Sequence, residues 1–297
     1  MGEFKRVGLV AWTGSDLITE TLRSVSSFLE EQSVDVVLEK RTASRLGCEA
    51  GAASVEELGT MTDLVIAVGG DGNILGAGRS LAPVGTPLLG INRGRLGFLA
   101  DVSPDEIEER IGEVLAGEYA IEEHFLLEGR LADDSGEWYS ALNEVIVHSA
   151  TMARMIEFDL YIDDKFVYNQ YSDGLIISSP TGSTAYALSA GGPIMHPSLD
   201  AMALIPMFPH SLNSRPLVVP GSSVLRIEIG PMYSGRARVS FDSQQEFSLK
   251  PGQAVHIRQM AEKLKLIHPP GHSFYGVCRS KLQWAHPPGG GDPRSQA

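Results

Sequence analysis

The sequence contains few cysteines, fewer basic than acidic residues, and no long hydrophobic run. Its two cysteines, Cys48 and Cys278, lie far apart without a C-x-x-C spacing. This pattern argues against a disulfide framework or a structural zinc site, and it favours a reducing compartment. Because no apolar run reaches about 18 residues, a membrane-spanning helix is not expected. The apolar stretch after the N-terminus is too short for a signal peptide. We therefore expect a cytoplasmic protein.

The shortage of positive charge restricts the partners of the chain. Lysine and arginine number 24 against 37 acidic residues, which gives a net charge of -13. Such a surface repels nucleic acids and anionic membranes, so neither is expected as a partner. A polyanionic ligand must instead meet backbone donors or a local positive patch. Hydrophobic residues make up 43% of the 297 residues, which is enough for two domains with ordinary cores.

Two patterns of hydrophobicity divide the chain. The first third alternates short apolar runs with helical patterns, which predicts a parallel sheet covered on both faces. The predicted strands are 7–11, 34–38, 64–68 and 87–91, and the predicted helices are 17–31 and 73–81. After residue 120, runs of period two predict an antiparallel β-rich domain. These runs are 122–131, 138–148, 156–162, 224–229, 236–241 and 254–258.

We therefore predict an N-terminal α/β domain and a C-terminal antiparallel β domain. The first is assigned to residues 1–120 and the second to residues 121–270. Residues 271–284 are expected to return to the N-terminal domain. Residues 285–297 are rich in proline and glycine without apolar periodicity, which predicts a disordered tail.

The segment Gly69-Gly70-Asp71-Gly72-Asn73 lies between a predicted buried strand and a predicted helix. Ligands bind at the carboxyl ends of parallel strands, and a helix N-terminus offers free N–H groups to phosphate. The segment therefore predicts a nucleotide site with Asp71 at its centre. The alternative is a tight turn in which Asp71 caps the helix. The spacing fits neither the dinucleotide-binding fingerprint nor a P-loop, since Leu75 stands where the third glycine belongs and no Gly-Lys-Ser/Thr follows.

Two further segments carry polar groups next to predicted strands. Residues 172–193 run from an apolar strand into a turn rich in hydroxyl groups, which suits a sugar or a base edge. The alternative is a helix start capped by Thr181 or Ser183. Asn143-Glu144 can hold two ribose hydroxyls, because an amide and a carboxylate offer both donors and acceptors. The alternative is an exposed pair on a strand.

The histidines and carboxylates do not predict a metal site made by side chains alone. His148 and His210 are interpreted first as structural residues, because lone histidines seldom carry chemistry. The sequence shows no histidine and carboxylate cluster at ligand spacing. A divalent cation is therefore expected to arrive with a nucleotide.

Five stretches in this order resemble the bacterial NAD kinases over nearly the whole chain: 69–73, 92–100 (NRGRLGFLA), 143–148 (NEVIVH), 172–193 and 205–218 (IPMFPHSLNSRPLV). The resemblance implies an N-terminal α/β domain and a C-terminal β domain, with the active site between them. It also implies a homotetramer or homodimer. The implied reaction is transfer of the terminal phosphate of ATP to the 2′-hydroxyl of NAD, giving NADP, with Mg²⁺ bound to the ATP. A non-catalytic dinucleotide sensor and a lipid kinase, which shares the Gly-Gly-Asp-Gly loop, are the alternatives.

The same resemblance assigns roles to individual residues. Asp71 resembles the proton acceptor for the 2′-hydroxyl, with Gly72 beside the nucleotide and Phe98 on the adenine side. Asn143 and Glu144 resemble the pair that binds NAD. The other implied binding positions are Arg154, Tyr171, Asp173 near the nicotinamide, the turn residues Thr184, Ala185, Tyr186, Leu188 and Ser189, and Gln244. Tyr171 departs from related sequences, which carry a basic residue before the Ser-Asp-Gly.

Overall fold

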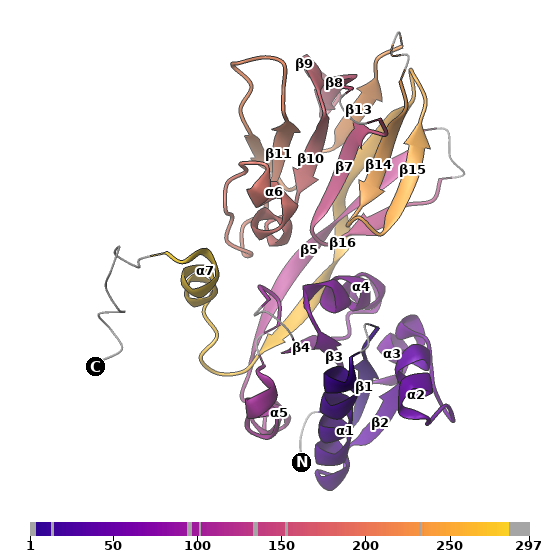
Figure 1. Cartoon of the computed structure of the whole chain (residues 1–297), viewed down its shortest axis with the longest axis vertical. Coiled ribbons are helices and arrows are strands. Elements are labelled where there is room, and N and C mark those ends of the chain that lie inside the picture. Colours follow the sequence, from indigo (N-terminus) through magenta and orange to yellow (C-terminus); the bar gives the residue numbers. More distant parts are fainter. Residues whose placement is uncertain are drawn as a thin grey trace. The chain divides into compact units, whose positions relative to one another are not determined.

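The computed structural model forms two compact units. Unit 1 comprises residues 1–121 and 266–297, and unit 2 comprises residues 122–265. The structure describes residues 4–12, 15–93, 97–100, 102–132, 136–151, 154–231, 233 and 235–284. The tail predicted at 285–297 lies outside these residues. Each unit is described by itself, and Figure 1 labels its helices and strands.

Unit 1 alternates strands and helices along the chain. Its elements are β1 (Arg6–Val10), α1 (Asp16–Glu31), β2 (Asp35–Leu38), α2 (Lys40–Leu46), α3 (Val55–Met61), β3 (Leu64–Gly69), α4 (Asp71–Leu81), the 3-10 turns η1 (Ala82–Val84) and η2 (Pro104–Glu106), β4 (Leu88–Asn92), α5 (Ile107–Leu115) and α7 (Phe274–Leu282). The long strands β5 (Ala120–Leu131) and β16 (Ala254–His268) each have one end in this unit.

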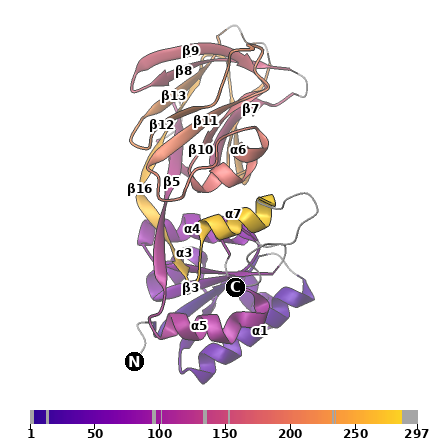
Figure 2. The same ribbon diagram turned by 90° about the vertical axis from the view of Figure 1, so that its left-hand side faces the viewer.

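The sheet of unit 1 is parallel. Its strand order is β2-β1-β3-β4, and Leu266 and Ile267 of β16 add a further parallel pairing next to β4. Figure 2 shows α3 and α4 on one face of the sheet and α1 and α5 on the other. Ile18, Leu22 and Val25 lie on the buried face of α1 because their spacing follows the helical repeat. The predicted α/β class is confirmed for this unit.

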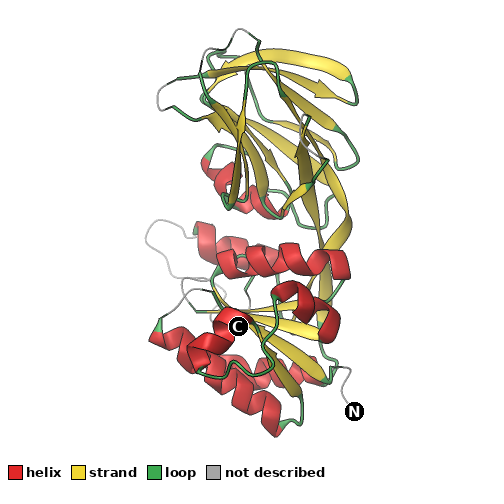
Figure 3. Cartoon of the chain, turned by 90° about the vertical axis from the view of Figure 1, so that its right-hand side faces the viewer, coloured by secondary structure: helices red, strands yellow, loops and turns green. Residues whose placement is uncertain are grey.

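Unit 2 is built almost entirely of strands, as Figure 3 shows. Besides most of β5 and β16, it contains β6 (Tyr139–Ala141), β7 (Glu144–Ser149), β8 (Ile156–Ile162), β9 (Lys165–Ser172), β10 (Gly174–Ser178), η3 (Thr181–Thr184), α6 (Tyr186–Ser189), β11 (Ala201–Met207), β12 (Leu217–Pro220), β13 (Leu225–Ile229), β14 (Ala237–Phe241) and β15 (Gln245–Leu249).

Two antiparallel layers enclose the core of unit 2. One sheet has the order β12-β11-β10-β7-β14-β15, and the other pairs β16 with β13, β13 with β8 and β8 with β9. Val145 and Leu175 from the first layer pack in one buried cluster with Phe158 and Ile227 from the second. The predicted antiparallel β class is confirmed. The prediction of one run over 138–148 is wrong in detail, because β6 and β7 are separate strands.

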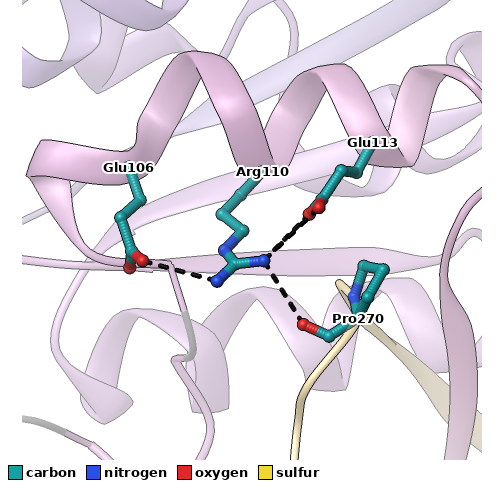
Figure 4. A network of polar contacts seen from close by, with 4 residues as sticks. All are labelled: Glu106, Arg110, Glu113 and Pro270. Carbon is teal, nitrogen blue, oxygen red and sulfur yellow. Dashed lines mark hydrogen bonds and ion pairs between the residues drawn. The ribbon is translucent and has the colours of Figure 1, made fainter.

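The segment that follows β16 is attached to α5. The guanidinium of Arg110 donates to Glu113 at 3.1 Å, to Glu106 at 3.4 Å and to the Pro270 carbonyl at 3.4 Å (Figure 4). The two carboxylates raise the pKa of Arg110. Since these groups are accessible to solvent, the network orients the segment more than it stabilises it. Among the helices of the described ranges, none has the length and apolar composition to cross a membrane.

Candidate functional site

Asp71 lies in unit 1 at the carboxyl end of β3, where α4 begins. Its carboxylate accepts the backbone N–H of Phe98 at 2.9 Å and that of Leu99 at 3.2 Å. The alternative of Asp71 as a helix cap is wrong. Gly70 occupies the cap position, without a side-chain bond, and Asp71 is the first helical residue. The carboxylate is therefore held by a segment more than 25 residues away and is half-buried at the loop surface.

The backbone before Asp71 requires glycine at one position. Gly69 has a φ of +146°, and a Cβ there would lie 2.0 Å from the side-chain nitrogen of Asn73. That nitrogen donates to the carbonyl of Val68 at 2.7 Å and so fixes the end of β3. Gly70 and Gly72 are exposed, with open space beside their α-carbons. The loop thus leaves room beside Asp71 for a ligand phosphate.

Gly97 lies directly against the Asp71 carboxylate. A Cβ at this position would lie 1.8 Å from one carboxylate oxygen and 2.7 Å from the carboxylate carbon. The ring of the neighbouring Phe98 lies 5.3 Å from the ammonium group of Lys281 in α7. Residues 97–99 therefore contact both α4 and α7. Because residue 97 has no side chain, the Asp71 carboxylate can occupy the space beside it.

Gly97→Ala should displace that carboxylate without disturbing the core. We expect turnover to fall by roughly 100-fold, since small misplacements of a reacting group have effects of this size. Gly112→Ala is the matched control, because a Cβ there meets only Phe28, at 3.8 Å. Steady-state rates and melting temperatures of both variants check the prediction. Unchanged turnover in Gly97→Ala would show that the position of the carboxylate is unimportant.

In unit 2, Asn143 precedes β7 and Glu144 is its first residue. Glu144 is only 5% exposed, so the alternative of an exposed pair is wrong for this carboxyl. Its Oε2 has no hydrogen-bond partner among the described residues. Burial first, and the charge of Asp242 second, raise the pKa of Glu144 to about 8. Glu144 is therefore mostly a neutral acid at pH 7, able to donate as well as accept a hydrogen bond.

The turn after β10 is fixed by its own hydroxyl groups. Ser183 donates to the carbonyl of Pro180 and accepts the N–H of Met195 at 2.9 Å. Neither Thr181 nor Ser183 caps a helix, so this alternative is wrong: Pro180 and Ala185 hold the cap positions of η3 and α6. The buried hydroxyls stabilise the turn and leave the residues after it partly accessible. These are Thr184, Ala185, Tyr186, Leu188 and Ser189.

One cavity of about 640 Å³ in unit 2 collects four of the predicted binding residues. These are Arg154, Asp173, Tyr186 and Gln244, and His148, Ser240 and Glu246 also line it. Arg154 follows β7, Asp173 lies between β9 and β10, Tyr186 begins α6, and Gln244 lies in the β14–β15 loop. The fold therefore brings these four residues together although up to 90 positions separate them in the sequence. The lining offers positive, negative and aromatic groups, which suits a polar ligand with ring systems.

Other predicted positions lie elsewhere. Tyr171 is 51% exposed on β9 and lines a separate groove with His210. Its phenol bonds to Glu157, which raises its pKa. His148, by contrast, lines the first cavity. It lies 3.3 Å from Glu246, and its Nδ1 is 2.9 Å from the carbonyl oxygen of Ser149, so this histidine has structural partners.

Sequence reasoning missed Asp242, which begins the loop after β14 and contacts the backbone at the start of β7. The only local signal was an acidic residue in a hairpin loop, and Asp is common in such turns. Asp242 has a positive φ of 49°, as turn residues of this kind do.

Comparison with known proteins identifies relatives along the chain. The ATP-NAD kinase N-terminal domain model matches residues 7–119, and the ATP-NAD kinase C-terminal domain model matches residues 142–269. The NAD kinase of Teredinibacter turnerae is 50% identical over 288 residues, which covers 96% of this chain and 98% of the relative. The NAD kinase of Azotobacter vinelandii is 48% identical over 295 residues, which covers 98% and 100%.

Two solved structures share the architecture. An NAD kinase from Archaeoglobus fulgidus in complex with ATP has a TM-score of 0.73 at 28% identity and covers 93% of this chain and 99% of its own. Yeast NADH kinase complexed with NADH has a TM-score of 0.85 at 24% identity, covers 95% and 89%, and shows the common fold.

The glycine-flanked aspartate after a parallel strand and the β sandwich that follows, together with these relatives, define a nucleotide-dependent phosphotransferase. The chain belongs to the NAD kinase family. The enzyme class and the function predicted from the sequence, phosphoryl transfer from ATP to NAD to give NADP, are thereby confirmed.

Proposed function

We propose that Asp71 takes the proton from the 2′-hydroxyl of the adenosine ribose of NAD as the phosphate is transferred. The observation that carries this assignment is the Asp71 carboxylate, fixed by two backbone N–H groups beside exposed glycines. Each carboxylate oxygen accepts one of these bonds and retains capacity for another. Phosphoryl transfer depends chiefly on positioning and charge stabilisation, so a fixed acceptor for the hydroxyl proton is the contribution expected of this loop.

The donor is proposed to be ATP carrying Mg²⁺. The exposed backbone at Gly70 and Gly72 and the N-terminus of α4 provide N–H groups for phosphate oxygens. Asp71 is the one carboxylate of the loop, and both of its oxygens already accept N–H bonds. The loop therefore fits a cation held mainly by the phosphates, where it would offset their charge.

We further propose that Asn143, Glu144 and the cavity of unit 2 bind NAD. A neutral Glu144 suits a ribose, because it can donate to one hydroxyl oxygen and accept from another. Arg154, Asp173, Tyr186 and Gln244 surround a cavity large enough for a nucleotide ring system. Thr184, Ala185, Leu188 and Ser189 are assigned to the same ligand by their place on the turn, and Phe98 and Gly72 to the nucleotide in unit 1.

The chain is also proposed to form a homo-oligomer in the cytoplasm. Phe208 and Leu212 are 77% and 90% exposed. Between them in the chain, His210 donates its N–H to the carbonyl of Tyr171 on β9 at 2.9 Å, and both of these residues line a groove of about 550 Å³. Apolar side chains in such numbers on one segment favour an interface. Light scattering of the purified protein tests the assembly, and a monomer would refute it. The two free thiols support a reducing compartment.

Turnover by the purified protein tests the activity. NAD, ATP and Mg²⁺ are supplied, and NADP is detected with an NADP-specific dehydrogenase. We expect NADP at a rate proportional to enzyme. NAD binding without NADP formation would favour the sensor, and phosphorylation of diacylglycerol in place of NAD would favour the lipid kinase.

A further inference from the structure

Asp242 makes an unusual set of contacts at the start of β7. Its Oδ2 accepts the N–H of Leu142 at 2.8 Å, and its Oδ1 accepts those of Asn143 at 2.8 Å and Glu144 at 3.1 Å. Its own N–H donates to the carbonyl of Glu144 at 3.0 Å. The residue is only 7% exposed, so these bonds do not compete with water. One carboxylate thus accepts the N–H groups of three successive residues.

The same three residues are held from the opposite side. The hydroxyl of Ser179 donates to the carbonyl of Leu142 at 2.5 Å, and the N–H of Ser179 donates to the carbonyl of Asn143 at 2.9 Å. Residues 142–144 are therefore fixed at their N–H groups by Asp242 and at two of their carbonyls by Ser179. This backbone orients the side chains of Asn143 and Glu144.

Only a carboxylate fits this position. Three N–H donors converge on it, and a carboxylate offers about four lone pairs, whereas an asparagine amide offers two and directs its own N–H groups at the remainder. A buried N–H without an acceptor destabilises the arrangement. The charge of Asp242 also acts on Glu144, whose pKa it raises together with burial. Across the sheet, the β10 neighbour of Glu144 is Ser178, which does not titrate.

We propose that Asp242 is a positioning residue for dinucleotide binding, which fixes the backbone of Asn143 and Glu144 and so orients their side chains. The inference rests on the proposed role of Asn143 and Glu144 in binding NAD. Asp242 itself belongs to the loop between β14 and β15 and is assigned no contact with the ligand.

Asp242→Asn in the full chain tests this inference. We expect the Kd and KM for NAD to rise about 10-fold or more, since loss of a buried hydrogen-bond acceptor has effects of this order. The value of kcat at saturating NAD and the KM for ATP should change less than about 3-fold. NAD binding is expected to change with pH as Glu144 ionises. In the variant this change should occur at lower pH, because the pKa of Glu144 falls when the negative charge of Asp242 is removed.

Asp63→Asn is the matched control. The Asp63 carboxylate accepts the N–H of Lys5 at 2.8 Å and of Arg6 at 2.9 Å, in unit 1. This variant should lose some stability but keep its Kd for NAD and its pH profile. If Asp242→Asn behaves in the same way, with the NAD affinity and the pH profile both unmoved, Asp242 is a structural residue and the inference is wrong.

Two more variants separate the possible failures. Ser179→Ala removes the hydroxyl that bonds to the Leu142 carbonyl and leaves the charge of Asp242 in place. It should raise the Kd for NAD without changing the pH dependence of NAD binding. An unchanged Kd would contradict the inference even if Asp242→Asn does not fold. Glu144→Ala removes both the donor and the acceptor and tests the underlying site. If its affinity for NAD is normal, the proposed binding role of Glu144 fails, whatever Asp242 does.

Discussion

Asp71→Asn is expected to abolish most turnover, by roughly 10³-fold or more, while NAD still binds. General base groups contribute effects of about this size, and an amide cannot accept the hydroxyl proton. The amide oxygen can still accept an N–H from Phe98 or Leu99, so the loop should keep most of its structure. The measurement is kcat with saturating NAD and ATP, together with the Kd for NAD.

The control for Asp71→Asn is the melting temperature of the variant, because loss of one loop contact should lower it only slightly. Gly97→Ala provides a second comparison, since it keeps the carboxylate and moves it. Turnover close to that of the parent protein in Asp71→Asn would contradict the role as proton acceptor. A large fall in both turnover and NAD affinity would instead indicate a role in binding.

Glu144→Gln should stabilise the fold at alkaline pH. The pKa of Glu144 is raised from an ordinary value near 4.5 to about 8, so between these values the folded chain retains a proton that the unfolded chain has released. The free energy of unfolding therefore falls as the pH rises through this window. Glutamine does not ionise, so the variant should be more stable than the parent by about 4 kcal/mol at pH 8 and nearly equal at pH 4.

Glu39→Gln is the matched control for this effect. Glu39 is also 5% exposed, but its carboxylate accepts the N–H and the hydroxyl of Thr42. Its replacement should destabilise the fold, because a satisfied buried acceptor is lost. Denaturant unfolding at several pH values measures both variants. Equal stability of Glu144→Gln and the parent at pH 5 and pH 8 would show that Glu144 ionises freely in the folded protein.

Most of the predicted strands and both long helices agree with the structure to within about two residues, because burial on one or both faces leaves a periodic record in the sequence. Besides the run 138–148, the strand predicted at 254–258 is wrong at its end, because β16 continues to His268. α1 and α4 lie where apolar periodicity placed them. α2 and α3 were not predicted, since seven residues hold too few turns to show the period. The capping box of Ser54 and Glu57 was the available signal for α3.

The candidate site was predictable only in part. The glycines around Asp71 and the resemblance to bacterial NAD kinases predicted that Asp71 follows a strand, and the structure places it directly after β3. The separation of β6 from β7 was not predictable, because the carboxylate that takes the N–H groups of residues 142–144 stands about 100 residues later in the chain. The raised pKa of Glu144 was not predictable either, because it depends on burial by strands that are distant in sequence and on the charge of Asp242.

The sequence by itself determined the two domain classes and the family, because periodicity and motif spacing are local properties of the chain. Only the tertiary structure decided where the Asp71 carboxylate lies, why residue 97 has no side chain, and which charge state Glu144 adopts. Hydrogen bonds and desolvation act between groups that are close in space, and in this fold those groups come from segments that are distant in sequence.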